Sequence, residues 1–288
     1  MRATKAGLSV KAVEALRVES TTSISWNTKT LTTSNPLKGN TMLTKLLNYL
    51  KRNKTKTPVV EEKTNVYDYL TRNSKIRKMT GVKTFNWGIP AFKAANGFKT
   101  CPNAAACAKG CYATQGAYLF SNVAKVFEKR LALALSDSFV STIDAEIKRR
   151  KVERLRIHDS GDFFNAAYLE KWIAIMKANP NVEFYAYSKM VSMLKTYSKS
   201  GRIPSNFTII YSFGGTEDKL IDTTKDRHSA VFTTVRALKR AGYADAHLND
   251  SVALGENHRI GLVYHGTKNY ENTDWSKVKG AGSTKKAA

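Results

Sequence analysis

The chain has little cysteine, little negative charge and no long apolar run. Only three of its 288 residues are cysteine, an odd number that leaves no complete disulfide framework. Acidic residues number 23 against 47 Lys and Arg, which gives a net charge of +24 at pH 7. Its apolar runs are short and broken by charges, so the sequence predicts no membrane span. Residues 1–20 lack the continuous apolar stretch of a signal peptide.

These absences predict a cytosolic protein in a reducing compartment, where cysteines bind metals more often than they form disulfides. The positive excess predicts a polyanionic partner, because such a surface releases counterions when it binds one. DNA or RNA is therefore the expected partner. The alternative is that the excess of positive charge has no role in binding, as in many basic proteins.

All three cysteines lie within eleven residues, at Cys101, Cys107 and Cys111, in the spacing C-x5-C-x3-C. Three thiolates on one loop suit a metal or an iron–sulfur cluster whose fourth position is filled by something else. One alternative is a [4Fe–4S] cluster whose open iron takes S-adenosylmethionine (SAM). Another is zinc with a fourth ligand such as His158 or His265. A third alternative is three unligated thiols, which is disfavoured because thiols gathered on a glycine-containing loop serve no packing purpose. Between the other two, the number and position of the cysteines favour the cluster over zinc.

From residue 82 onward, strand signals alternate with helix signals. Strands are predicted at residues 82–87, 152–157, 182–187, 207–212 and 259–264. Helices are predicted at residues 121–135, 138–147, 168–179, 190–197 and 230–240. The N-cap of the first of these helices is expected to be Ser121 or Asn122. This order indicates the α/β class with parallel β/α units, in a barrel, part of one or an open sheet. We expect a partial or distorted parallel β/α barrel. The cysteine loop follows its first strand, as in radical-SAM enzymes, although their usual spacing is C-x3-C-x2-C.

The chain is predicted to have three parts. Residues 1–60 form a basic, partly disordered arm, residues 61–279 a β/α core domain with the metal site, and residues 280–288 a flexible tail. Within the arm, residues 42–54 place leucines at helical spacing among lysines. A helix packed on the domain is the favoured interpretation over one that binds nucleic acid or an acidic membrane.

The loop after the 152–157 strand carries the predicted catalytic residues His158, Asp159 and Asp162. Loops at the carboxyl ends of parallel strands share one face, so this loop should lie beside the cysteines. Asp159, Asp162 and Ser160 can bind ribose or amine groups, and His158 can act as a ligand or an acid/base. The alternative is that Ser160 and Gly161 make a turn and Asp162 caps the next helix.

Residues after other strands complete the predicted cofactor site, which comprises Ser160, Gly161, Ser188, Lys189, Ser212, Gly214, Gly215 and His265. Paired glycines let the backbone approach a cofactor closely, although a plain turn has the same sequence signal. Lys189 can contact a carboxylate or phosphate or remain solvated. A lone His at a strand end is more often held by hydrogen bonds than by a metal.

Several stretches together resemble the "gene product eighty-eight" family of bacteriophage proteins: Asn73-Ser74-Lys75, Thr100-Cys101-Pro102, Cys111-Tyr112-Ala113, and residues 156–163, 184–187 and 261–266. The similarity spans about residues 65–275. It implies a phage origin and the cytoplasm of the bacterial host cell. The family's CYA-ended cysteine loop is similar to that of other phage proteins related to radical-SAM enzymes.

Two functions are therefore expected. The first is a phage-encoded, radical-SAM-like iron–sulfur enzyme that acts on or with nucleic acid. The second is a non-catalytic nucleic-acid-binding protein whose cysteine loop holds a structural zinc ion or cluster.

Overall fold

The structure is a computed structural model that describes residues 67–266. These residues all fall within one unit of the chain, Thr64–Ala288. The predicted arm, its 42–54 helix and the 280–288 tail lie outside the described residues, and the predicted domain boundaries stay predictions. Within residues 67–266, none of the helices has the length and apolar character needed to cross a membrane.

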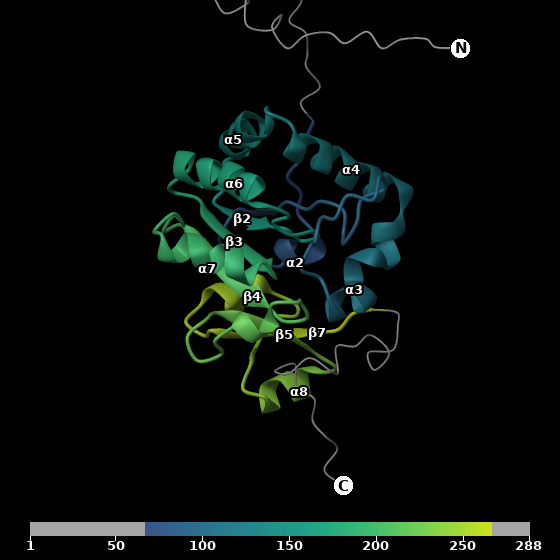
Figure 1. Cartoon of the computed structure of the whole chain (residues 1–288), viewed down its shortest axis with the longest axis vertical. Helices are drawn as coiled ribbons and strands as arrows, with labels where there is room; N and C mark the ends of the chain where they lie inside the picture. The colour runs from purple at the N-terminus through teal and green to yellow at the C-terminus, as the bar shows by residue number, and fades with distance from the viewer. Residues whose placement is uncertain (1–66, 267–288) are drawn as a thin grey trace, which may run out of the picture. The chain divides into compact units, whose positions relative to one another are not determined.

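Within residues 67–266, seven strands form one curled sheet in the order β1-β2-β3-β4-β5-β7-β6, and every neighbouring pair is parallel. The strands are β1 (Thr84–Asn86), β2 (Arg154–Ile157), β3 (Glu183–Ser188), β4 (Phe207–Ser212), β5 (His228–Phe232), β6 (Ala244–Asp245) and β7 (Arg259–Val263). The sheet makes a half-barrel (Figure 1). The predicted α/β class and partial parallel β/α barrel are confirmed.

Most helices connect consecutive strands. They are α2 (Ser74–Arg77), α3 (Ala106–Gly110), α4 (Ser121–Leu135), α5 (Phe139–Arg150), α6 (Ala166–Ala178), α7 (Val191–Lys199) and α8 (Val235–Arg240). Four 3-10 turns accompany them: η1 (Tyr112–Thr114), η2 (Gly116–Leu119), η3 (Asp218–Leu220) and η4 (Asp250–Leu254). Figure 1 shows α5, α6 and α7 along one side of β2, β3 and β4.

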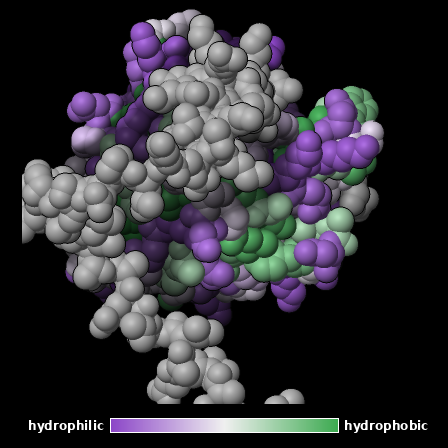
Figure 2. All heavy atoms as spheres, turned by 90° about the horizontal axis from the view of Figure 1, so that it is seen from above, coloured by the Kyte–Doolittle hydropathy of each residue, from purple (hydrophilic) through white to green (hydrophobic). Residues whose placement is uncertain are grey.

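Side chains alternate between the two faces of the curled sheet, as the pleat requires. On β2 and β3, Leu155, Ile157 and Phe184 are buried in the main apolar core. The intervening side chains Arg156 and Tyr187 line a cavity. The face of the sheet that carries Arg156 and Tyr187 therefore forms part of the wall of this cavity. Where Figure 2 shows the described residues on the outside, hydrophilic side chains lie around an apolar area.

The helix predicted over residues 230–240 is wrong in its first part. Residues 228–232 form strand β5, and α8 begins only at Val235. Ala230 and Phe232, two residues apart, are buried on the same face, which is the period of a strand. The Thr234 side chain accepts a hydrogen bond from Ala237 N–H and starts the helix there. The predicted cap of α4 is also wrong, because Phe120 precedes this helix and gives it no side-chain bond.

Both edges of the sheet are short. At the β1 edge, Thr71 and Asn86 exchange two backbone hydrogen bonds of 2.9 and 2.7 Å in an isolated antiparallel bridge. At the other edge, β6 has only two residues, Ala244 and Asp245.

Candidate functional site

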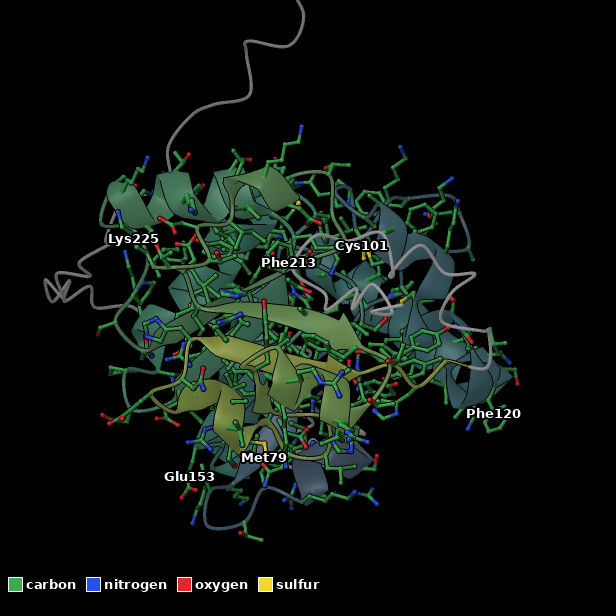
Figure 3. The ribbon with its side chains drawn as sticks, turned by 90° about the horizontal axis from the view of Figure 1, so that it is seen from below. Met79, Cys101, Phe120, Glu153, Phe213 and Lys225 are labelled. Carbon is green, nitrogen blue, oxygen red and sulfur yellow. The ribbon has the colours of Figure 1, made fainter. Side chains whose placement is uncertain are left out.

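A cavity of about 890 Å³ lies at the carboxyl ends of the strands. In Figure 3, Cys101 and Phe120 lie on the side to which the strand arrows point, and Glu153 and Lys225 lie on the opposite side. Eleven of the predicted site residues line the cavity: Cys101, Cys107, Cys111, His158, Asp159, Ser160, Gly161, Asp162, Lys189, Ser212 and His265. Ser188, Gly214 and Gly215 are not among the lining residues. The structure therefore brings most of the predicted site together from loops far apart in sequence.

The three cysteines are free thiols on a loop that carries α3. The N–H of Phe92 donates a hydrogen bond to Cys101 Sγ at 3.4 Å. Burial raises the pKa of Cys101 to about 12, and the nearby Asp162 carboxyl adds to the shift. Burial also raises the pKa of the Cys111 thiol. Both shifts favour the neutral thiol form of these two cysteines.

Gly214 and Gly215 hold the cysteine loop in place. The Gly214 carbonyl accepts hydrogen bonds from the N–H groups of Ala105 and Cys107, both at 3.1 Å. The N–H groups of both glycines donate in turn to the Asp218 carboxylate. A Cβ on Gly215 would lie 2.9 Å from the Asn103 carbonyl oxygen. The close approach predicted for this glycine pair is thus an approach to the cysteine loop.

Lys189 and Asp162 are the charged groups beside the thiols. Asp162 accepts hydrogen bonds from Ser188 Oγ at 2.6 Å and from Lys189 N–H at 2.8 Å. The predicted site residue Ser188 therefore contacts Asp162. Lys189 Nζ donates to Ser212 Oγ at 2.9 Å. Burial alone would lower the pKa of Lys189, but Cys107 and Asp162 raise it above its usual value. We name Cys101, Cys107, Cys111, Asp162 and Lys189 the thiol cluster.

Asp162 does not cap the following helix, so that alternative is wrong. Asn165 caps α6 instead, because its side chain accepts from Tyr168 N–H at 2.8 Å. The predicted turn at Ser160 and Gly161 is present: Gly161 has a φ of +85°, and a Cβ there would lie 2.2 Å from Ile89 Cγ1. Ser160 Oγ is buried without a partner.

His158 is packed among aromatic rings. Its Nε2 lies 3.1 Å from Tyr168 Oη, and its ring centroid lies 4.6 Å from that of Phe163. Burial lowers the pKa of His158 to about 3, so the imidazole is neutral at physiological pH. Its Nδ1 is buried and has no partner. This environment leaves His158 able to exchange a hydrogen bond with a ligand, whereas a cationic acid role is disfavoured.

Asp159 is the centre of a second polar group in the cavity. Its Oδ2 accepts hydrogen bonds from Asn86 Nδ2 at 2.8 Å and Asn73 Nδ2 at 3.4 Å, whereas its Oδ1 is buried without a partner. Burial raises the pKa of Asp159, and Arg156 and Arg130 offset part of this effect. The Tyr112 hydroxyl donates to the Asp159 backbone carbonyl, which ties the cysteine loop to this group.

Sequence reasoning missed a buried charge network beneath the cavity. Asp250, from η4, is 0 % exposed and pairs with Arg156 at 2.8 Å and with Lys75 at 2.7 Å. The hydroxyl groups of Tyr185 and Tyr187 donate to the same carboxylate. Arginine at an inward position of β2 was the one available signal, since a charge in a buried strand needs a partner.

This fold and this cavity define a parallel β/α half-barrel protein with a three-cysteine loop at the carboxyl end of its sheet. The sequence model of the protein family described as "Gene product 88" matches residues 45–286 of this chain. The chain therefore belongs to the Gene product 88 family, as its motifs predicted.

Two relatives are bacteriophage proteins, which supports a phage origin for this chain. The Gene 88 protein of Mycobacterium phage L5 is 30% identical over 207 residues, which cover 63% of this chain and 83% of the relative. The Gene 88 protein of Mycobacterium phage D29 is 28% identical over 137 residues, which cover 43% and 55% respectively. No solved structure matches the chain.

Proposed function

We propose that this protein is an iron–sulfur enzyme of the host cytoplasm that binds a [4Fe–4S] cluster through Cys101, Cys107 and Cys111 and takes SAM at the open iron. The observation that carries the proposal is the meeting of three thiols with the carboxyl-end loops of a parallel half-barrel in one cavity. A cluster of this kind, with SAM bound, supplies radical chemistry.

The surroundings of the sulfurs support a cluster. The Phe92 N–H bond to Cys101 Sγ is a contact of the sort that tunes cluster sulfurs. Within residues 67–266, no three Cys, His, Asp or Glu side chains are arranged to hold one metal ion. A single zinc ion would need the three sulfurs to close around one point. A cubane cluster accepts more widely spaced sulfurs, because each thiolate binds a different iron.

The polar groups of the cavity give the chain's own residues defined roles. In the thiol cluster, Lys189 provides an ammonium group for a carboxylate, and Asp162 holds the Lys189 backbone in position. Asp159 Oδ1, Ser160 Oγ and His158 Nδ1 are buried without partners, so each can bond a hydroxyl or amine of a ligand. The volume of about 890 Å³ lies within the range of about 300–1,000 Å³ usual for ligand sites.

The test is anaerobic purification of the full chain, followed by iron and sulfide analysis and an ultraviolet–visible spectrum. We expect about four irons per chain and, with a reductant and SAM, formation of 5′-deoxyadenosine. Each single Cys→Ser variant at the three positions should lose iron. The matched control is Ala108→Ser, which adds a hydroxyl to α3, the short helix that contains Cys107, and removes no thiol. A full cluster that neither binds nor cleaves SAM would refute the enzymatic part.

A non-catalytic nucleic-acid-binding protein is the second candidate, and the net charge of +24 favours it. Its cysteine loop would hold a structural zinc ion or a cluster with a fourth protein ligand. This candidate predicts stoichiometric zinc or an inert cluster, together with DNA or RNA binding that weakens steeply as salt increases. Undetectable or salt-insensitive binding would contradict it. The enzymatic proposal also expects nucleic acid as its partner, so SAM cleavage is the measurement that separates the two.

A further inference from the structure

Among residues 67–266, Arg130 is a buried cation that forms no ion pair, although the Asp159 carboxyl lies near enough to act on it electrostatically. Arg130 lies on α4, is 2 % exposed and lines the cavity. Among residues 67–266 its one hydrogen bond runs from Nη2 to Thr71 Oγ1 at 3.1 Å, its Nε has no partner, and no carboxylate forms an ion pair with it. A guanidinium carries five N–H donors, so most of its bonding capacity is unused.

Aromatic rings fix this guanidinium in place. Its central carbon lies 5.8 Å from the ring centroid of Trp87 and 5.4 Å from that of Phe127. Such stacking offsets part of the free energy that burial of the charged guanidinium costs, but it provides no negative charge. The guanidinium of Arg130 thus has aromatic neighbours and one hydroxyl partner among residues 67–266, and its Nε stays available to an acceptor.

Arg156 lines the same cavity and also has an unpartnered Nε. Its ion pair with Asp250 does not make this side of the cavity neutral, because Lys75 shares the same carboxylate. Two cations and one anion leave one positive charge in excess. In all, the cavity wall carries the five cations Lys75, Lys78, Arg130, Arg156 and Lys189 and the two carboxyls Asp159 and Asp162, and with Asp250 beneath them the balance is five cations against three carboxyls.

The charged side chains of the cavity fall into two sets by the groups that they act on. Arg130 and Arg156 act electrostatically on Asp159, whereas Asp162 and Lys189 are the charged neighbours of the cysteines. The cavity thus has two polar groups, one at the thiol cluster and one around Asp159. The amide groups of Asn73 and Asn86 occupy one oxygen of Asp159, and its other oxygen is left for a ligand.

We propose that Arg130 and Arg156 form a subsite for an oxyanion, a phosphate or a carboxylate, carried by a second molecule that binds in the cavity beside the cofactor. Asp159 and its asparagines contact the part of that molecule next to the oxyanion. That the second molecule is the substrate rests on the proposed function. The subsite itself depends only on the arginines and the cavity.

The experiment measures anion binding by the full chain as purified. Inorganic phosphate and malonate are titrated separately by calorimetry, with sodium chloride used to keep the ionic strength constant. Phosphate and malonate distinguish the two oxyanion sources. The variants are Arg130→Gln and Arg130→Lys. The control is Arg236→Gln, which removes one positive charge at an exposed position on α8. Circular dichroism confirms that each variant is folded.

We expect saturable binding of one anion, weakened at least tenfold by Arg130→Gln, less by Arg130→Lys and not by Arg236→Gln. If Arg130→Gln does not fold, the comparison of Arg130→Lys with the control decides. Three results would overturn the proposal: no saturable binding of either anion, equal binding by the Arg130 and Arg236 variants, or displacement of the anion by stoichiometric SAM. A chain without iron or SAM cleavage that still binds the anion through Arg130 would instead refute the proposed function alone.

Discussion

Replacing Asp250 by asparagine tests the buried charge network directly. The substitution keeps the side-chain shape but removes the one negative charge between Lys75 and Arg156. Both cations then face each other in a desolvated interior, and breaking a buried ion pair in this way costs about 3–5 kcal/mol. For a unit of this size, roughly 2–4 °C of melting temperature is lost per kcal/mol, so Asp250→Asn should lower Tm by roughly 6–20 °C.

The assay is thermal and urea unfolding followed by circular dichroism. The control is Glu170→Gln, which breaks the exposed ion pair with Arg202 and should cost at most about 1 kcal/mol. The reasoning is refuted if Asp250→Asn is no more destabilising than this control. Such a result would mean that water or a rearranged tyrosine hydroxyl replaces the carboxylate.

The same residue predicts an acid dependence. Burial alone would raise the pKa of Asp250, but Arg156 and Lys75 hold it below its usual value. Because the folded-state pKa is the lower one, the stabilisation is complete above the unfolded pKa of about 3.9 and is lost as pH falls through the folded pKa. Asp250→Asn should remove this part of the acid transition. A wild-type and a variant curve that remain parallel below pH 4 would contradict it.

Three further predictions concern the loops around the cavity. Gly88→Ala would place a Cβ 2.0 Å from Asp159 Oδ1, so we expect a loss of about 1–3 kcal/mol in urea unfolding, whereas Gly255→Ala, whose nearest contact is 3.6 Å, should be mild. The His158 ring should show no titration by NMR between pH 5 and 8, and a titration midpoint near pH 6.5 would contradict its burial. Because burial lowers the pKa of His158 to about 3 in the folded state, the stabilisation is complete above about pH 6.5, the unfolded pKa. Below that pH the free energy of unfolding should fall by up to roughly 1.4 kcal/mol per pH unit. Asp218→Ala should speed amide hydrogen exchange in the cysteine loop, since Asp218 anchors the glycines that hold it, and unchanged protection would refute that link.

Much of the fold could be predicted because its signals are local. Strand β4 spans Phe207–Ser212 as predicted, and the helix after Ser138 is present as α5. The helix predicted over residues 230–240 failed because Val231 and Val235 have helical spacing. In the structure, Ala230 and Phe232 are buried in the apolar core and pair with the distant strand β7, which selects a strand. Tertiary packing decided between two periods that the local sequence allowed.

The site divides in the same way. The cysteines and the His158–Asp162 loop could be predicted from their positions after strands. The partners of Arg130 and Asp250 could not: Arg130 contacts Thr71 from 59 positions away, and Asp250 pairs with Arg156 across 94. These contacts exist only because the sheet curls and brings β2 opposite η4. The role of Gly214 was missed because a backbone carbonyl carries no sequence signature.

An open half-barrel has two edges, which in many sheet proteins are sites of aggregation. Here the β1 edge already bonds Thr71, and the β6 edge offers only two residues. Within residues 67–266, neither edge strand presents a long row of amides and carbonyls to which a strand of another chain could add. The half-barrel can therefore keep one side open for its cavity without inviting edge-to-edge assembly.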